Sequence, residues 1–207
     1  MRITDTLKQE HRVIEQVLDA LEKLTSRARA DGCFDRHSAG DIVRFMQQFA
    51  DAWHHGKEEG LLFPALVAKG IPGDAGPIGV MQAEHEFGRA AVRKMEAALW
   101  EPMEDKQAVE RFLDHAEQFV DHLRAHIQKE DHILFPMADS VLTTADHVSL
   151  LGDTERSDQE GQGLATEELY VALANQLADR FGVRRACDRH EGVFTGCFGS
   201  GSGRAST

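Results

Sequence analysis

Apolar residues recur every three or four positions through most of the chain, the spacing that gathers side chains on one face of an α-helix. Four such stripes lie before residue 140. The first fades before Asp31, the second begins near Ser38, and the third follows a Gly/Pro-rich loop at residues 70–77 and ends before Pro102. The stripes run through Ile3, Leu7, Ile14, Leu18 and Leu21; Val43, Met46, Ala50, Leu61 and Ala65; Ile78, Met81, Gly88, Val92, Met95 and Leu99; and Phe112, Phe119, Leu123, Ile127, Leu134 and Met137.

Four helices of about 20–30 residues with short connections predict an all-α fold, an antiparallel up-down four-helix bundle. After Met137 we expect a short helical piece at 143–151, a polar, glycine-containing stretch at 152–163 and one additional C-terminal helix at 166–181. That helix is too short to bury a core alone, so it should pack on the bundle. The expected organisation is a bundle (1–139), a helical extension (140–190) and a flexible Gly/Ser-rich tail (191–207).

Charge and composition narrow the class of protein. The 207 residues carry a formal net charge of −12, which disfavours nucleic acid as a partner because phosphate backbones are bound by basic surfaces. No apolar run approaches the roughly 20 residues that cross a bilayer, and the N-terminus lacks the apolar segment of a signal peptide. Three cysteines are too few for a disulfide framework. These observations predict a soluble, cytoplasmic protein.

An internal repeat carries the candidate chemistry. The eleven residues from His54 to Pro64 align with those from His126 to Pro136, and both copies read H-x-x-K-E-[ED]-x-x-L-F-P. A Glu-His pair precedes each copy, ending at His11 and at His85. Each repeat therefore consists of a helix with one histidine and a helix with His-x3-Glu.

These polar residues interrupt the apolar stripes, because positions four apart lie one above the other on a helix. The bundle interior would then contain four imidazoles and two carboxylates, and a buried carboxylate without partners is costly. A bound metal resolves that cost. The predicted ligands are His11, His54, Glu58, His85, His126 and Glu130.

The ligand types restrict the metal. Histidine and carboxylate without thiolate suit iron, manganese or zinc. Two carboxylates on opposing helices can bridge two ions with two imidazoles left for each, whereas one structural zinc needs only four ligands. The ferritin arrangement uses Glu-x-x-His on two helices and fits this pattern poorly.

Over residues 4–139 these motifs resemble the hemerythrin-like (HHE cation-binding) proteins, and the text of residues 76–86 is similar to their iron–sulfur-repair, nitric-oxide-responsive branch. The resemblance implies a non-haem centre of two iron ions with an oxo or hydroxo bridge, in which Glu58 and Glu130 bridge the ions. Oxygen-carrying hemerythrins have a fifth histidine one turn after the third-helix histidine. Arg89 occupies that position here, which argues against reversible O2 carriage.

Other polar residues have two interpretations each. His122, one turn before His126, could approach the same ion or be a partly buried histidine bonded to a neighbour. Surface or supporting roles suffice for His55, His115 and His132, and Glu10, Glu84 and Asp51 are candidates to hold ligand N–H groups. Cys187, His190 and Cys197 form at most a weak metal or redox motif, and surface thiols are the simpler interpretation.

Two functional hypotheses follow. The first is a di-iron protein that binds or reacts with O2, NO or peroxide, since a bridged ion with two imidazoles keeps an open position. The second is a non-catalytic iron or oxygen sensor, or an iron-handling module, that acts through a protein partner. Its C-terminal helix and tail would carry the output. A zinc-stabilised bundle is a third, colourless alternative. The sequence leaves the reaction, the partner and the oligomeric state open.

Overall fold

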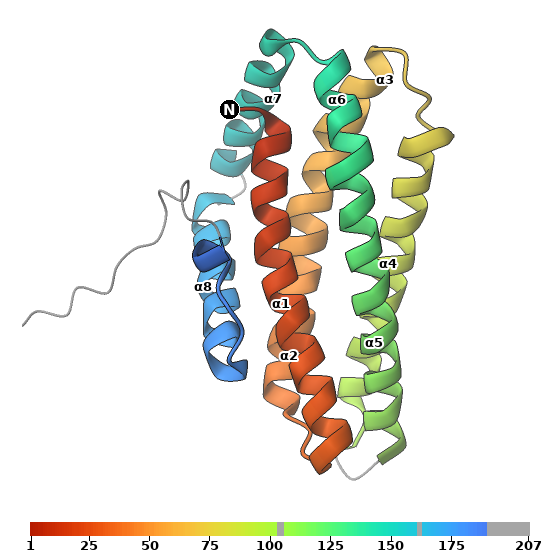
Figure 1. Cartoon of the computed structure of the whole chain (residues 1–207), viewed down its shortest axis with the longest axis vertical. Coiled ribbons are helices and arrows are strands. Elements are labelled where there is room, and N and C mark those ends of the chain that lie inside the picture. The colour runs from red at the N-terminus through yellow and green to blue at the C-terminus, as the bar shows by residue number, and fades with distance from the viewer. Residues whose placement is uncertain (103–105, 161–162, 190–207) are drawn as a thin grey trace, which may run out of the picture.

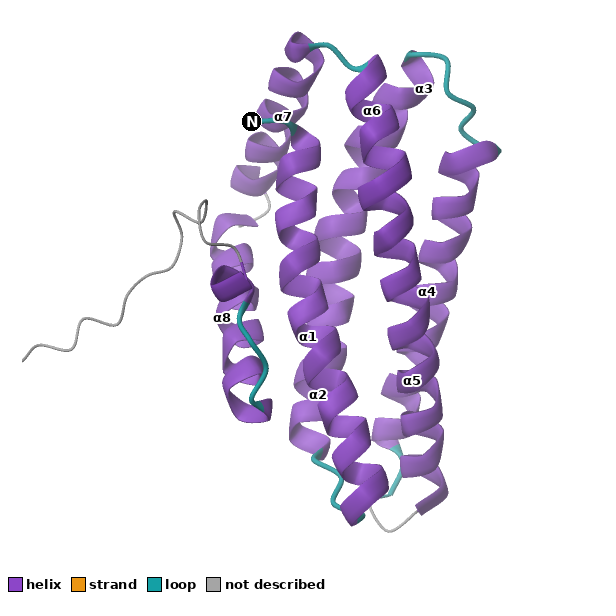
Figure 2. Cartoon of the chain, in the orientation of Figure 1, coloured by secondary structure: helices purple, strands orange, loops and turns teal. Residues whose placement is uncertain are grey.

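The computed structural model describes residues 1–102, 106–160 and 163–189, and all regular secondary structure in these ranges is helical (Figure 2). Two of the long helices change locally into π-helix. In chain order the elements are α1 (Ile3–Asp31), then α2 (Arg36–Phe45), η1 (Met46–His55), η2 (Glu58–Leu62) and α3 (Phe63–Ala68) in one continuous rod, α4 (Gly76–Trp100), and α5 (Lys106–Lys129), η3 (Glu130–Leu134) and α6 (Phe135–Val141) in a second continuous rod. The extension contains α7 (Thr144–Glu160), α8 (Gly163–Phe181) and the short 3-10 turn η4 (Ala186–Arg189).

The predicted fold class is confirmed. The helices α1 and α4 and the two rods that contain α2 and α5 run antiparallel to their neighbours along one long axis (Figure 1). The helices α7 and α8 lie on the outside of the bundle, beside α1. Within the described ranges, no helix combines the length and the apolar character needed to cross a membrane.

Local signals place the ends of the first two helices. The helix α1 stops at Gly32, whose φ of 68° is left-handed and whose N–H bonds to the carbonyl of Ala28. The next helix begins slightly before the predicted start at Ser38. Its N-cap is Asp35, whose carboxylate accepts a hydrogen bond from the backbone N–H of Ser38 at 3.0 Å.

The extension is more helical than predicted. The polar stretch expected at 152–163 is helical through Glu160, so two helices rather than a short piece and one helix follow the bundle. A capping box starts α7, because Thr143 and Asp146 bond reciprocally to each other's backbone N–H. The single Gly152 costs only about 1 kcal/mol relative to alanine, too little to end a capped helix. Residues 190–207, which include the predicted flexible tail, lie outside the described residues, and the domain boundaries stay a prediction.

The apolar core is divided into two clusters. One contains Ile3 and Leu7 of α1, together with Phe63 and Phe135, and the other begins at Val13 and continues toward the opposite end of the bundle. Between them α1 contributes His11, which is fully buried. A layer of buried polar side chains therefore separates two hydrophobic halves of one bundle.

Buried polar contacts attach the extension to α1. The amide nitrogen of Gln16 donates to Asn175 at 3.2 Å, and its oxygen accepts from the backbone N–H of Ala186 at 2.5 Å. Leu177 and Phe181 of α8 join the larger apolar cluster. Gln16 is 1% exposed, and its hydrogen bond to Ala186 is buried.

We expect Gln16→Ala to lower the free energy of unfolding by about 1–3 kcal/mol, because it leaves the buried N–H of Ala186 unpaired. Urea denaturation of the metal-free protein measures this change. The matched control is Lys23→Ala on the exposed face of the same helix, which should change stability by less than about 0.5 kcal/mol. Equal midpoints for the two variants would contradict the role assigned to Gln16.

Candidate metal centre

Three π-helical segments carry much of the site. In both repeats the backbone N–H of the Phe in Leu-Phe-Pro bonds five residues back, from Phe63 to the carbonyl of Glu58 and from Phe135 to that of Glu130. The following proline has no N–H with which to restore the α-helical pattern. The longer segment η1 ends at His54 and His55, and both side chains are buried.

All six predicted ligands lie in the buried polar layer, and none is more than 1% exposed. Together with His55, they form two adjoining groups of potential ligands, and the ligand atoms within each group lie inside 4.8 Å of one another. The first group is His11, His54, Glu58 and Glu130, and the second is His55, Glu58, His85 and His126. Glu58 belongs to both groups, so the arrangement is consistent with a dinuclear metal site.

Both carboxylates lie between the two groups of imidazoles. Glu130 places one oxygen 3.1 Å from Nε2 of His11 and the other 3.2 Å from Nε2 of His126. Glu58 places its oxygens 3.9 Å from Nε2 of His54 and 3.4 Å from Nε2 of His85. Each carboxylate therefore faces both groups, the geometry that bridging requires.

Unpartnered atoms provide the test of whether these residues fit a metal. Nε2 of His11 and His54 and both oxygens of Glu58 and Glu130 are buried and have no hydrogen-bond partner. Leaving a buried polar atom unsatisfied costs about 1–3 kcal/mol. Cations placed among these atoms would satisfy all of them at once, so the residues fit a metal centre.

Every predicted histidine ligand is oriented by a carboxylate. Its Nδ1–H donates to that carboxylate, which leaves Nε2 as the atom that faces the centre. The pairs are His11 with Asp131 (2.8 Å), His54 with Glu10 (2.9 Å), His85 with Glu59 (2.6 Å) and His126 with Glu84 (2.9 Å). These four bonds join neighbouring helices in a closed ring around the bundle.

The ring of hydrogen bonds also accounts for the lysine and the [ED] position of the repeat. Lys57 and Lys129 bind Glu10 and Glu84, the carboxylates that orient the histidines three residues earlier. The candidate roles of Glu10 and Glu84 agree with these contacts. Sequence reasoning missed Glu59 and Asp131, although the shared [ED] position directly after each bridging glutamate was the available signal.

The two phenylalanines of the repeats close the apolar end of the centre. Phe63 stacks on His85 with ring centroids 5.9 Å apart, and Phe135 stacks on His11 at 5.4 Å. Both phenylalanines are buried and belong to the apolar cluster at that end of the bundle. They exclude water from one side of the polar layer.

Protons balance the charge of the metal-free centre. Burial by itself lowers the pKa of His11, but the nearby carboxylates of Asp131 and Glu130 outweigh it and raise that pKa to about 10. Burial is likewise outweighed at His85, where the facing carboxylates of Glu130 and Glu58 raise the pKa to about 10. Burial raises the pKa of Glu130, yet His126 and His11 hold it well below its ordinary range. Metal ions must displace these imidazole protons.

Other candidates lie elsewhere. The Nε2–H of His122 donates to the backbone carbonyl of Glu84 at 3.0 Å, so this histidine is a partly buried, hydrogen-bonded residue outside both groups.

Several other polar candidates also lie outside the two groups. Arg89 contacts Asp51, Glu59 and Glu86. His132 is exposed, and His115 is half-buried outside both groups. Cys187 is described and half-buried, whereas His190 and Cys197 lie outside the described residues.

Of the two interpretations of His55, the surface one is wrong. The side chain is 5% exposed, and one of its ring nitrogens belongs to the second group of potential ligand atoms. The α-helical spacing used for the prediction turns residue 55 about 100° away from residue 54. The π-helical segment η1 changes that relation, and the apolar pattern gave no signal of it.

The fold and site together define a helical-bundle protein with a buried His/Glu centre able to hold metal. Residues 2–138 match the Hemerythrin HHE cation-binding domain, and the chain belongs to this family. A comparison with curated proteins finds no match, and a comparison with solved structures finds none either.

We expect metal binding to release protons. At pH 8 the metal-free protein holds protons on His11 and His85, because each pKa of about 10 lies above the ordinary 6.5, and a metal ligand must be a neutral imidazole. Binding of Zn²⁺ as a probe should release about two protons from this pair, and affinity should rise with pH up to about 10. The two imidazolium ions stabilise the metal-free fold below about pH 6.5, and that stabilisation is lost as pH rises toward 10.

Proton release is measured with an indicator dye in weak buffer, and stability by the melting temperature of the metal-free protein. The control is His122→Ala, which should release as many protons as the wild type. Binding without proton release, at an affinity independent of pH between 7 and 9, would contradict this charge balance.

Proposed function

We propose that this chain is a non-haem di-iron protein that binds or reacts with O2, NO or peroxide. The observation that carries the proposal is the pair of adjoining, buried ligand groups that share Glu58 and face unpartnered atoms toward each other. Room for a second ion next to the first distinguishes this centre from a single structural zinc site.

The ligand chemistry supports iron. The two groups contain only imidazole and carboxylate donors, and Cys33, which is exposed, lies in the loop after α1 rather than among them. Imidazole nitrogen and carboxylate oxygen suit iron, which can change its oxidation state while these ligands hold it. Iron would supply the redox chemistry, while Glu58, Glu130 and the imidazoles bind it and exclude bulk water.

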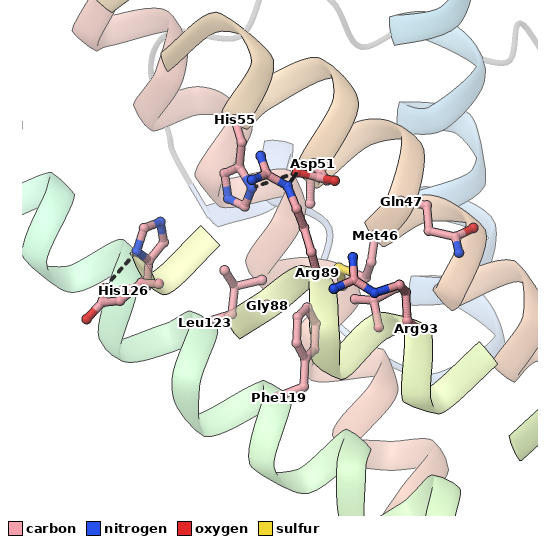
Figure 3. Close-up of a pocket in the computed structure, with 13 residues that line it drawn as sticks. Met46, Gln47, Asp51, His55, Gly88, Arg89, Arg93, Phe119, Leu123 and His126 are labelled. Atoms are coloured by element: carbon pink, nitrogen blue, oxygen red, sulfur yellow. Dashed lines mark hydrogen bonds and ion pairs between the residues drawn. The ribbon is translucent and has the colours of Figure 1, made fainter. Parts of the chain in front are cut away.

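A pocket beside the centre, here called the access pocket, is of a size that supports a small reactant. A pocket of about 90 Å³ between η1, α4 and α5 ends at His55 and His126 (Figure 3). Organic ligands usually occupy pockets of about 300–1,000 Å³, so this one admits molecules of only a few atoms. Two small residues, Gly88 and Ala50, line part of it.

The sequence of residues 76–86 is the basis for including NO among the reactants, because this segment resembles the nitric-oxide-responsive branch of the family. We further propose a cytoplasmic location with no nucleic-acid or membrane partner. The net charge of −12 and, in the described part of the chain, the thiols of Cys33 and Cys187 support these assignments.

A sensor that acts through a protein partner is the second candidate function. The observation that favours it is the contact of the extension with the helices that carry the ligands. Gln16, which binds Asn175 and Ala186 of the extension, lies on the same helix as His11. In addition, Thr154 of α7 lines a pocket with Trp53, Lys57 and Leu61 beside η1 and η2.

Aerobic purification, metal analysis and an absorption spectrum test the proposal. Two iron ions per chain with near-ultraviolet oxo-to-iron bands support it, and a colourless protein loaded with zinc overturns it. Exposure of the reduced protein to O2, NO or peroxide then separates the candidates. Rapid turnover favours the reactive protein, whereas iron-dependent proteolytic protection of α7 and α8 without turnover favours the sensor.

We expect Glu58→Ala and Glu130→Ala each to lose at least one iron ion, because each carboxylate faces both groups. The measurement is the iron content after dialysis against a weak chelator. Glu117→Ala, on the exposed surface of α5, is the matched control and should retain two ions. Retention of two ions by both site variants would show that neither carboxylate bridges.

A further inference from the structure

His55 has the properties of a ligand that the repeat motif does not include. It is buried at the end of η1, and its Nε2 is one of the atoms without a hydrogen-bond partner. One ring nitrogen of His55 lies within 4.8 Å of ligand atoms of Glu58, His85 and His126. A histidine that merely filled the core would have its second nitrogen bonded to protein or turned toward solvent.

Three imidazoles from three helices converge at this point. The ring of His55 stacks on that of His85, with centroids 3.8 Å apart and planes 12° from parallel. The ring of His126 meets His55 edge-on, with centroids 5.6 Å apart, and its Nε2 lies 3.2 Å from Nε2 of His85. Nitrogen atoms that face one another at this distance suit ligands of one ion.

His55 also faces a carboxylate, although the contact is longer than those of the other four imidazoles and lies within one helix. Its Nδ1 lies 3.4 Å from the carboxylate of Asp51, and Asp51 accepts a hydrogen bond from Nε of Arg89 at 2.8 Å. Arg89 also donates to Glu59, the carboxylate that orients His85. Figure 3 shows Arg89 extended from α4 toward Asp51 and His55.

We propose that His55 is a fifth imidazole ligand, which binds through Nε2 to the ion held by His85 and His126. Asp51 and Arg89 are positioning residues for it. The inference rests on the proposed two-metal centre and makes its ions unequal, with three imidazoles on one and two on the other. Arg89, at the position of the absent third-helix histidine, thus supports a histidine supplied by the second helix.

The test is a titration of the metal-free full chain with Co²⁺, whose visible absorption changes with the number and type of its ligands. The variants are His55→Ala and Asp51→Ala, with His122→Ala as the matched control. In His55→Ala one of the two ions should bind at least tenfold more weakly, with an altered spectrum, while the other binds as in the wild type. Asp51→Ala should weaken the same ion by about 10–100-fold, the usual effect of removing a carboxylate that orients a ligand.

His122→Ala should retain both affinities. Two Co²⁺ ions bound by His55→Ala with wild-type affinities and spectrum would overturn the inference. If His55→Ala does not fold, as judged by circular dichroism, Asp51→Ala decides: a weakened ion supports the inference, and unchanged binding overturns it. A wild-type chain that binds two ions but does not react with O2, NO or peroxide refutes the proposed reactivity. The Co²⁺ titration then still decides whether His55 is a ligand.

Discussion

The structure depends on the burial of two carboxylates, Glu58 and Glu130, at the centre of a bundle that is otherwise apolar. Neither has a hydrogen-bond partner, and each faces imidazoles from both groups. The cost of burying these charges accounts for the features around them: imidazoles point inward, outer carboxylates hold those imidazoles, and Lys57 and Lys129 hold two of the outer carboxylates. The polar layer is therefore organised from the inside outward.

The orienting bonds also position the helices. Each of the four bonds crosses from one helix to the next, so the ring fixes the rotation of all four helices about their own axes. Apolar packing on either side tolerates small rotations, because one aliphatic side chain can replace another at similar volume. A hydrogen bond between imidazole and carboxylate does not tolerate them, since it depends on direction. The site and the bundle thus hold each other in register.

The sequence was sufficient to predict the helices and the burial of the six polar residues, because both follow the α-helical period. His11 and His85 could be placed because they interrupt apolar stripes. His55 could not, since its inward direction depends on the π-helical segment η1, which no apolar pattern reveals. Glu59 and Asp131 resembled ordinary surface charges until the fold placed them against His85 and His11. The helical continuation of α7 through Glu160 was missed because its composition is polar and its capping box lies upstream.

The internal repeat gives the centre an approximate twofold symmetry, in which α1 and η1–η2 correspond to α4 and α5–η3. Two identical helical hairpins could form the same ring of hydrogen bonds. The two metal positions of such a symmetric centre would have equivalent surroundings. His55 and Asp51 break the symmetry, because the second copy has Ile127 and Leu123 at these positions. The access pocket also reaches only one half, at His55 and His126. Two substitutions in one copy of a duplicated helix are thus enough to make the two halves of the centre inequivalent, with one half facing the pocket and the other enclosed.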